Sequence, residues 1–250
     1  MTLLLKLTNI KNTELLAEWL KARYYSTKYV PVPIDEYLVY DNQIFPVSTS
    51  SAFFKTASQI GSGDQVSSLQ ATRKVLPSSF KELQQALANA VVALAVETAV
   101  SDHGALVFCG GRQSCQSVAA LIAGAMPVNH IRPELFDRRR DVVSELQSLP
   151  VGLDETLGRT LIRGVAFHRM CDFLGEPSFT ADFVDAGLTI EEREIIAEAY
   201  DQGIIRVIVA TCSLAAGINL PARRVILQGA RMGRELIGPA MLYVISADCS

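Results

Sequence analysis

The stretch Ile204-Ile205-Arg206-Val207-Ile208-Val209-Ala210 is an almost continuous run of apolar side chains, and Thr211 follows it. An apolar run of this length without polar alternation is typical of a strand buried on both faces of a parallel sheet. Upstream, Thr189 stands where a helix N-cap is expected, acidic residues occupy the opening turns, and Gly203 follows the apolar positions that end near Tyr200. These signals predict a helix from Thr189 through Tyr200. The segment therefore predicts a helix that packs on a sheet and leads into one of its buried strands.

The same alternation of strand and helix patterns extends over residues 79–250. Compact apolar runs predict three further strands, and longer stretches with helix signals predict four further helices. The expected strands are Gly104–Cys109, Gly164–His168 and Arg224–Leu227, and the expected helices are Phe80–Ser101 (capped by Ser78 or Ser79), Gln113–Ala125, Arg132–Leu149 and Asp154–Ile162. Strands that alternate with helices form a mainly parallel sheet between two helical layers. The sequence thus predicts a three-layer α/β fold.

In such a sheet, ligands bind at the edge where the strands end. The residues that directly follow the expected strands are therefore the candidates for a functional site. They are Cys109–Arg112, His168 and Thr211–Asn219. We expect these segments to lie together on one rim of the sheet.

The first 78 residues have a different pattern. The segments with a helix or strand pattern are Thr13–Tyr24 (helix) and residues 29–34, 37–40 and 44–47 (strands), with a turn at Asp41-Asn42-Gln43. Prolines within these strands favour edge positions, because proline cannot donate a ladder hydrogen bond. Residues 48–78 are rich in Ser, Thr, Gly and Gln. This composition predicts a linker or mobile loop.

The composition excludes several classes of protein. With 49% hydrophobic residues the chain is a packed globular protein rather than a disordered one, and a net charge of −3 excludes a chain-wide basic clamp for nucleic acid. Five cysteines without a C-x-x-C pair and three scattered histidines predict neither a disulfide framework nor a metal site. No stretch has the pattern of a signal peptide or the ~20 apolar residues that span a bilayer. We expect a soluble, intracellular protein without a membrane partner.

The most informative segment is Val209-Ala210-Thr211-Cys212-Ser213-Leu214-Ala215-Ala216-Gly217-Ile218-Asn219-Leu220-Pro221-Ala222. A buried strand ends in a turn rich in hydroxyl groups, and small residues lead to a glycine and an asparagine. Small side chains let a phosphate backbone approach closely, and hydroxyl and amide groups donate to phosphate oxygens. On spacing alone, a tight helix N-terminus after a strand explains this segment equally well.

The residue identities go further, because Thr-x-x-Leu-Ala-x-Gly-x-Asn-Leu-Pro-Ala resembles motif V of superfamily 2 helicases. Gly229-Ala230-Arg231-Met232-Gly233 resembles a narrower group, the helicases similar to the motor portion of DNA polymerase theta. Further segments resemble other parts of that group. Leu106–Cys109 with Arg112 and Cys115 is similar to motif IV, Gly164–His168 with Ala186–Arg193 to motif IVa, and Asn9–Leu20 to the segment after motif III.

This resemblance implies a RecA-like fold for residues 79–250, with 1–47 as the tail of a first RecA-like domain and 48–78 as the linker. It implies that Arg112, Thr211 and His168 contact a nucleic-acid strand, expected to be DNA. It also implies that Gly217 and Asn219 face the nucleotide. ATP and Mg²⁺ as cofactors, a first RecA-like domain as partner, a nuclear location and a role in DNA repair are further implications. For Arg112, a solvated residue at a helix start is the alternative.

The sequence departs from the family pattern in the parts that drive ATP hydrolysis. It contains no Gly-x-x-x-x-Gly-Lys-Ser/Thr phosphate loop, and neither Asp35-Glu36 nor Asp154-Glu155 follows the buried strand that a magnesium-binding Asp-Glu box needs. Motif VI, with its arginine finger, is expected after Met241-Leu242, where the chain reads Tyr243–Ser250. We therefore expect an incomplete second motor domain that is inactive alone. The alternative is a non-catalytic module, derived from a helicase, that binds nucleic acid or a partner.

Two local features need their own interpretation. Residues 169–185 separate His168 from Ala186, although the family pattern is continuous at this point. They are either a functional loop or a retained intron. The codons that could encode the ends of this segment favour the retained intron. Cys109 and Cys115 could suggest a thiol-phosphatase loop, but that loop needs arginine where Cys115 stands. We expect both cysteines to have packing roles.

Overall fold

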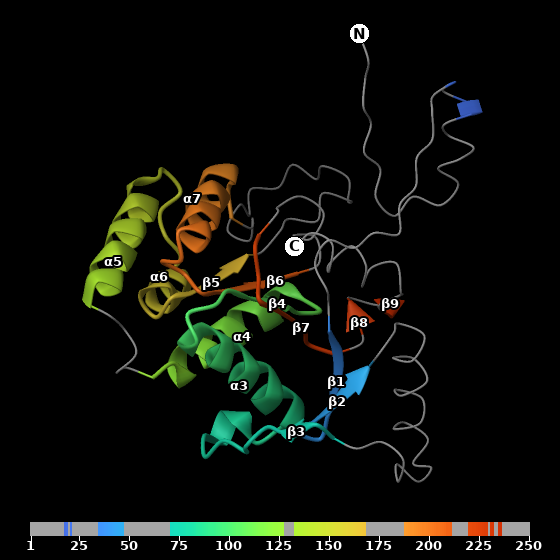
Figure 1. Ribbon diagram of the computed structural model, residues 1–250. Helices are drawn as coiled ribbons and strands as arrows, with labels where there is room; N and C mark the ends of the chain where they lie inside the picture. Colours follow the sequence, from blue (N-terminus) through green and yellow to red (C-terminus); the bar gives the residue numbers. More distant parts are fainter. Residues whose placement is uncertain are drawn as a thin grey trace.

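A parallel sheet of four strands lies at the centre of the computed structural model (Figure 1). The structure describes residues 18–19, 21, 35–47, 71–127, 133–168, 188–211, 220–229, 231–232 and 235–236. The strand order is β5-β6-β4-β7, and the three neighbouring pairs are all parallel. The strands are β4 (Ala105–Phe108), β5 (Val165–His168), β6 (Val207–Ala210) and β7 (Arg224–Leu227). All four expected strands are confirmed, and their apolar side chains form the core.

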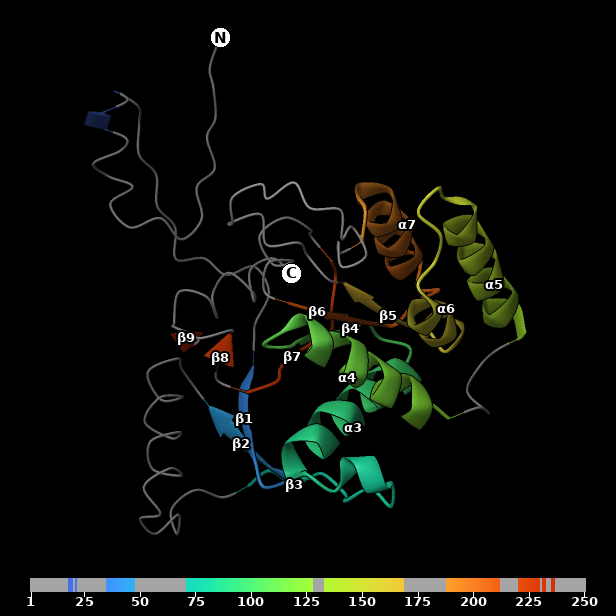
Figure 2. The ribbon, with the colours of Figure 1, turned by 180° about the vertical axis from the view of Figure 1, so that it is seen from behind.

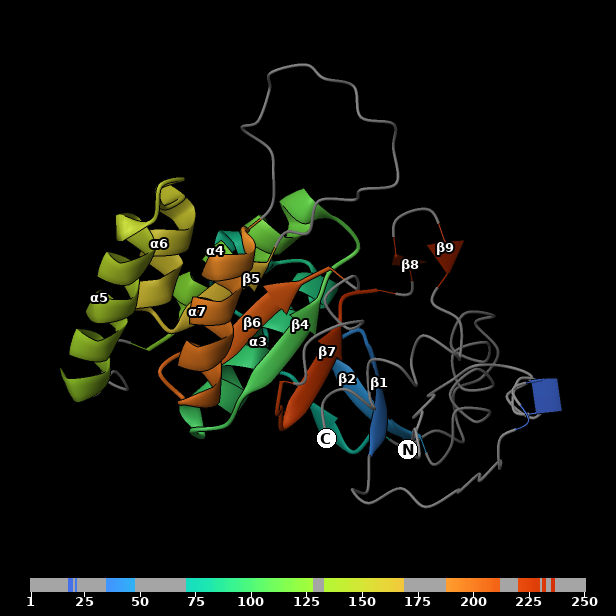
Figure 3. The ribbon, with the colours of Figure 1, turned by 90° about the horizontal axis from the view of Figure 1, so that it is seen from above.

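Helices cover both faces of this sheet, so the three-layer α/β fold is confirmed (Figures 1 and 2). Helices α3 (Ala86–Val100) and α4 (Arg112–Ala125) lie on one face, and α7 (Ile190–Asp201) lies on the other, as the view from above shows (Figure 3). Helices α5 (Pro133–Ser148) and α6 (Glu155–Ile162) lie beyond β5. Two residue pairs at Arg231–Met232 (β8) and Glu235–Leu236 (β9) form a small antiparallel ladder.

The ends of two helices follow the expected capping chemistry. The Thr189 hydroxyl accepts from the Glu192 backbone N–H, while the Glu192 carboxylate accepts from the Thr189 N–H at 2.7 Å. This reciprocal capping box satisfies two backbone donors that the helix itself cannot use. In α6 the Asp154 side chain accepts from the backbone of Leu157 at 2.9 Å. The N-termini of helices α7 and α6 are therefore capped by Thr189 and Asp154, the residues at which the sequence predicted these helices to begin.

The expected start of α3 is wrong. A helix from Phe80 with a serine cap was expected, but a single 3-10 turn (η2, Lys81–Leu83) comes first and α3 begins at Ala86. The backbone N–H of Ser78 donates instead to Asn89, and the Ser78 hydroxyl accepts from Phe80. Serine side chains compete for local backbone groups outside helices, and a distant partner decided the outcome here.

The expected turn at Asp41–Gln43 is confirmed. Strand β1 (Glu36–Tyr40) pairs antiparallel with β2 (Gln43–Val47), and Asp41 and Asn42 both have positive φ, at 46° and 57°. Positive φ at both central residues is the signature of a tight hairpin turn, which asparagine and aspartate tolerate. Of the expected helix Thr13–Tyr24, the structure describes Glu18 and Trp19, which are helical, and Lys21, which lies in a turn. The expected strand at 29–34 lies outside the described residues.

The last part of the expected linker is packed rather than loose. Arg73–Lys74 (β3) pairs with β2, and Val75 belongs to the buried core. Strand β3 pairs only with Gln43 and Ile44 of β2, so Pro46 lies beyond the ladder between β2 and β3. The backbone N–H that proline lacks is therefore not needed for a hydrogen bond to β3. The packing extends to α3, where Asn89 is 2% exposed and its side chain bonds Asn42, Leu76 and Ser78. Residues 71–78 thus correct the expectation of a structureless segment.

A chain of charged side chains joins this small sheet to the large one. Glu97 on α3 accepts from Arg73 at 2.8 Å and from Arg224 on β7 at 3.2 Å. Burial alone raises the pKa of the Glu97 carboxyl, but the bonds and charges of the two arginines together bring it below its usual value. Arg224 also donates to the Leu94 carbonyl and the Thr98 hydroxyl. Strand β3, helix α3 and strand β7 are therefore bonded together.

Candidate functional site

The four strands of the large sheet end at the same level. Phe108 lies opposite Ala210 and Leu227, and Ala210 lies opposite His168, so these residues form one row at the carboxyl edge. The hydrogen bonding continues one residue further, where the Cys109 N–H donates to the Ala210 carbonyl at 2.8 Å. The expectation that Cys109–Arg112, His168 and Thr211 share one rim is confirmed. Residues 212–219, which include Gly217 and Asn219, lie outside the described residues.

Two of the residues expected to contact a nucleic-acid strand, Arg112 and Thr211, follow these β-strand ends. Arg112 is the first residue of α4, and Gly111 is its N-cap, in extended conformation and without a side-chain cap bond. The first backbone N–H groups of a helix have no intrahelical acceptor, which favours an anion at this position. Thr211 directly follows β6 and is partly exposed. The structure thus places both residues at the carboxyl edge of the sheet. Their contact with a nucleic-acid strand stays a prediction.

His168 is placed differently from the other two. Its side chain is 4% exposed, and neither ring nitrogen has a hydrogen-bond partner. Burial and, to a smaller extent, the positive charge of Arg193 lower the imidazole pKa from 6.5 to about 4. The ring is therefore neutral at pH 7. Its expected strand contact stays a prediction, and it requires that the ring become accessible.

The two cysteines near this edge have packing roles, as expected. Cys109 and Cys115 are 1% and 0% exposed and belong to the core. Hydrogen bonding with Cys115, and then burial, raise the pKa of the Cys109 thiol. A buried, protonated thiol is a poor nucleophile. The structure therefore agrees with the rejection of a phosphatase loop.

The opposite edge of the sheet holds a buried cation that the sequence patterns did not indicate. Arg139 on α5 is 6% exposed, and its guanidinium donates to the carbonyls of Ile204 at 2.9 Å and Ile162 at 3.4 Å. Burial, and then the charge of Arg206, lower the pKa of Arg139 to about 10. The group lies against Gly164, which has a φ of +79°. One signal could have found it, because Arg139, Val142 and Leu146 share the buried stripe of α5.

No three His, Cys, Asp or Glu side chains in the described ranges gather so that they could hold a metal ion. None of the helices in the same part of the chain has the length and apolar character needed to cross a membrane.

Comparisons with known proteins agree with this geometry. Residues 142–233 match the family model "Helicase conserved C-terminal domain". The chain is 32% identical over 234 residues to DNA polymerase theta of Mus musculus, a match that covers 88% of this chain and 8% of that protein. It is 29% identical over 229 residues to "Helicase POLQ-like" of Homo sapiens, covering 91% of this chain and 18% of that protein.

An archaeal relative matches as well. The "ATP-dependent DNA helicase Hel308" of Pyrobaculum calidifontis is 32% identical over 160 residues, which cover 62% of this chain and 20% of that protein. The chain thus spans between 8% and 20% of the length of these three relatives. With its parallel sheet and its helicase C-terminal domain, the chain belongs to the superfamily 2 helicases related to DNA polymerase theta and Hel308.

Proposed function

We propose that this chain acts, in an intact protein, as the second motor domain of an ATP-dependent DNA helicase that couples ATP hydrolysis to strand translocation and unwinding. One observation supports the proposal most strongly. Cys109–Arg112 and Thr211, which resemble separate helicase motifs, meet at one edge of a parallel sheet through the bond from Cys109 to Ala210. Helix N-termini and side-chain donors on such an edge suit a chain of phosphates.

The edge can hold a strand without reading its sequence. Arginine offers a forked set of donors to phosphate oxygens, and a hydroxyl adds one more donor. A few such contacts can be released and remade without a large barrier, which is what stepping along a strand requires. We assign these contacts to Arg112 and Thr211, and to His168 once its ring is accessible.

ATP and Mg²⁺ belong mainly to other parts of the intact protein in this proposal. We place the phosphate loop and the magnesium-binding acids in a first RecA-like domain, and Gly217 and Asn219 face the nucleotide across the interface. Alone, the chain is expected to hydrolyse ATP no faster than background, since an arginine finger is worth about 10³-fold or more.

The proposed division of the chain needs one revision. Residues 79–250, with the insertion 169–185, remain the second motor domain, and 1–34 remain the tail of the first. We now add the hairpin 36–47 and residues 71–78 to the second domain, because Asn89 and Glu97 bond both to α3. A nuclear location and a part in DNA repair complete the proposal, supported by the likeness to DNA polymerase theta.

A binding titration tests this function on the chain itself. A fluorescent oligo-dT strand is titrated with the wild-type chain and with the variants Arg112→Gln and Thr211→Val at several salt concentrations, followed by anisotropy. We expect the affinity to fall as salt rises, with a slope of about 0.7 for each phosphate contact. Arg112→Gln removes one phosphate contact and should lower that slope by about 0.7. Thr211→Val should weaken binding at every salt concentration. Circular dichroism checks that both variants stay folded.

Two results would contradict the proposal. One is a wild-type chain that does not bind the strand at low salt. The other is binding that neither variant changes, which would favour a module that contacts a partner through a different surface. ATP hydrolysis by the isolated chain that is stimulated by a nucleic-acid strand would contradict only the expectation that the isolated chain is inactive.

A further inference from the structure

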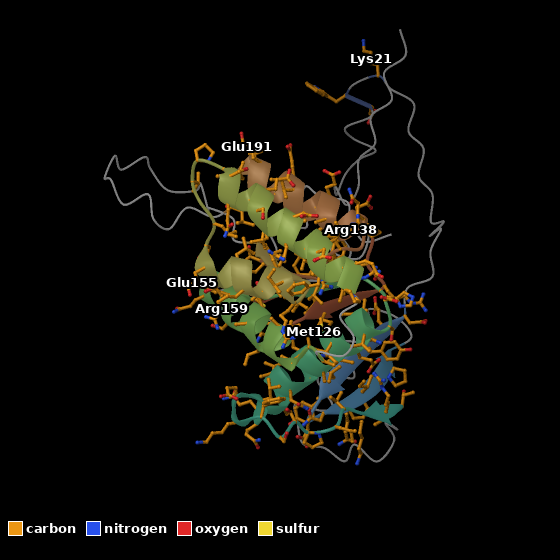
Figure 4. The ribbon with its side chains drawn as sticks, turned by 90° about the vertical axis from the view of Figure 1, so that its left-hand side faces the viewer. Lys21, Met126, Arg138, Glu155, Arg159 and Glu191 are labelled. Carbon is orange, nitrogen blue, oxygen red and sulfur yellow. The ribbon has the colours of Figure 1, made fainter. Side chains whose placement is uncertain are left out.

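Helices α4 and α6 lie side by side and run in the same direction. Helix α4 follows β4, so its first turn starts where that strand ends, at the carboxyl edge of the sheet. Helix α6 ends just before β5 begins at the amino edge, so its first turn lies towards the carboxyl edge. Figure 4 shows α6, on which Glu155 and Arg159 are labelled, next to α4. The first turns of the two helices are therefore neighbours.

These two first turns differ in how they are fixed. In α6 the Asp154 side chain caps the helix by accepting from the Leu157 N–H at 2.9 Å. In α4 the N-cap is Gly111, which has no side chain that could form such a bond. A side-chain cap holds the first backbone donors of a helix, and a glycine N-cap leaves this to other groups. The direction of the first turn of α4, which begins with Arg112, therefore depends on contacts elsewhere along the helix.

One hydrogen bond between side chains joins the two first turns. Gln116 on α4 donates from its Nε2 to the Thr156 hydroxyl on α6 at 3.0 Å, and both residues are partly buried. Gln116 lies four residues after Arg112, so these two residues share one face of α4. Thr156 lies between Asp154 and Leu157, which form the cap of α6. The bond thus connects the capped turn of α6 to the uncapped turn of α4.

We propose that Gln116 and Thr156 are positioning residues for strand binding, whose hydrogen bond sets the direction of the first turn of α4 and thereby the place of Arg112 at the carboxyl edge. Neither of the two contacts the nucleic acid itself. This inference rests on the proposed function, because it deepens the role given there to Arg112. A partly buried bond suits this task, because removing one partner leaves the other polar group unpaired and favours a shift of the helix end.

Oligo-dT binding tests this role with variants that change the bond but keep the size of each side chain. Gln116→Met removes the amide, Thr156→Val removes the hydroxyl, and Thr156→Ser keeps the hydroxyl. Ser117→Ala is the control on α4, because the Ser117 hydroxyl donates to the Gln113 carbonyl of the same helix at 3.0 Å. These variants and the double variant Gln116→Met/Thr156→Val are titrated at low salt, and thermal unfolding shows whether each remains folded.

We expect Gln116→Met and Thr156→Val each to lower the affinity for oligo-dT about threefold, and the double variant to bind no more weakly than either single variant. Thr156→Ser and Ser117→Ala should bind like the wild type. The decisive readout uses Arg112→Gln as a second background. There, Gln116→Met should lower the affinity no further, because its effect acts through Arg112. A merely structural bond would lower the melting temperature without this dependence on Arg112.

The outcomes separate this inference from the function on which it rests. If the wild-type chain binds oligo-dT but Gln116→Met leaves the affinity unchanged, or lowers it equally with and without Arg112, the positioning role is wrong and the proposed function stands. If the wild-type chain does not bind, the proposed function fails and this inference fails with it. If Gln116→Met is unfolded, the comparison of Thr156→Val with Thr156→Ser in the two backgrounds decides in the same way.

Discussion

Replacing Gly164 with alanine is expected to lower the free energy of unfolding by about 3–4 kcal/mol. Gly164 has a φ of +79°, a conformation that costs other residues roughly 1 kcal/mol or more. A Cβ there would also lie against Nη2 of Arg139 and 2.6 Å from its Cζ. The buried guanidinium would have to move and weaken its bonds to the carbonyls of Ile204 and Ile162.

Gly152 provides a matched control for this prediction. Its φ is +76°, but a Cβ added there meets nothing within 4 Å. Gly152→Ala should therefore show only the backbone cost of about 1 kcal/mol. Urea unfolding followed by circular dichroism measures both variants. If Gly164→Ala costs no more than Gly152→Ala, the contact with Arg139 does not hold the structure as described.

Acidification from pH 7 to pH 4 is expected to remove about 3 kcal/mol of stability through His168 alone. The folded-state pKa of about 4 lies below the ordinary value of 6.5, so the unfolded chain binds more protons between these two values. The contribution of His168 is therefore fully present above pH 6.5 and is lost as the pH falls towards 4. Burial is the main physical cause, and the charge of Arg193 adds to it.

A pair of variants isolates this contribution from that of the carboxylates, which titrate in the same range. The difference in free energy of unfolding between the wild type and His168→Gln should shrink by about 3 kcal/mol between pH 7 and pH 4. His103→Gln, at an exposed position, is the control for replacing a histidine by glutamine. A difference between wild type and His168→Gln that does not change with pH would show that the imidazole is solvated in the folded chain.

The parts of the fold that follow from local patterns were predictable from the sequence. Each buried strand is a continuous apolar run, and Thr189 caps its helix with Glu192 just as the spacing suggests. The strand expected at Ile204–Ala210 is shorter, beginning at Val207, because the backbone N–H groups of Ile204 and Ile205 donate to the Ala199 carbonyl at the end of α7. The motif residues placed the rim correctly because parallel strands end at a common edge.

The features that were missed depend on partners far away in the sequence. Asn89 bonds Asn42, 47 residues away, and Arg139 bonds the Ile204 carbonyl, 65 residues away. The helical spacing of Arg139 with Val142 and Leu146 indicates a buried position, but no local pattern indicates which distant group satisfies a buried polar side chain. The helix start expected at Phe80 failed for the same reason, since Asn89 takes the Ser78 N–H.

The central claim is that the carboxyl edge of this sheet holds the nucleic-acid strand. Hydrogen exchange of the wild-type chain, measured by mass spectrometry with and without saturating oligo-dT, tests it most directly. The account predicts slower exchange at residues 109–113, 188–193 and 211, and unchanged exchange at the amino edge, residues 103–105, 163–165 and 203–206. Slower exchange confined to the amino edge or to α5, or no change anywhere while the strand is bound, would contradict it.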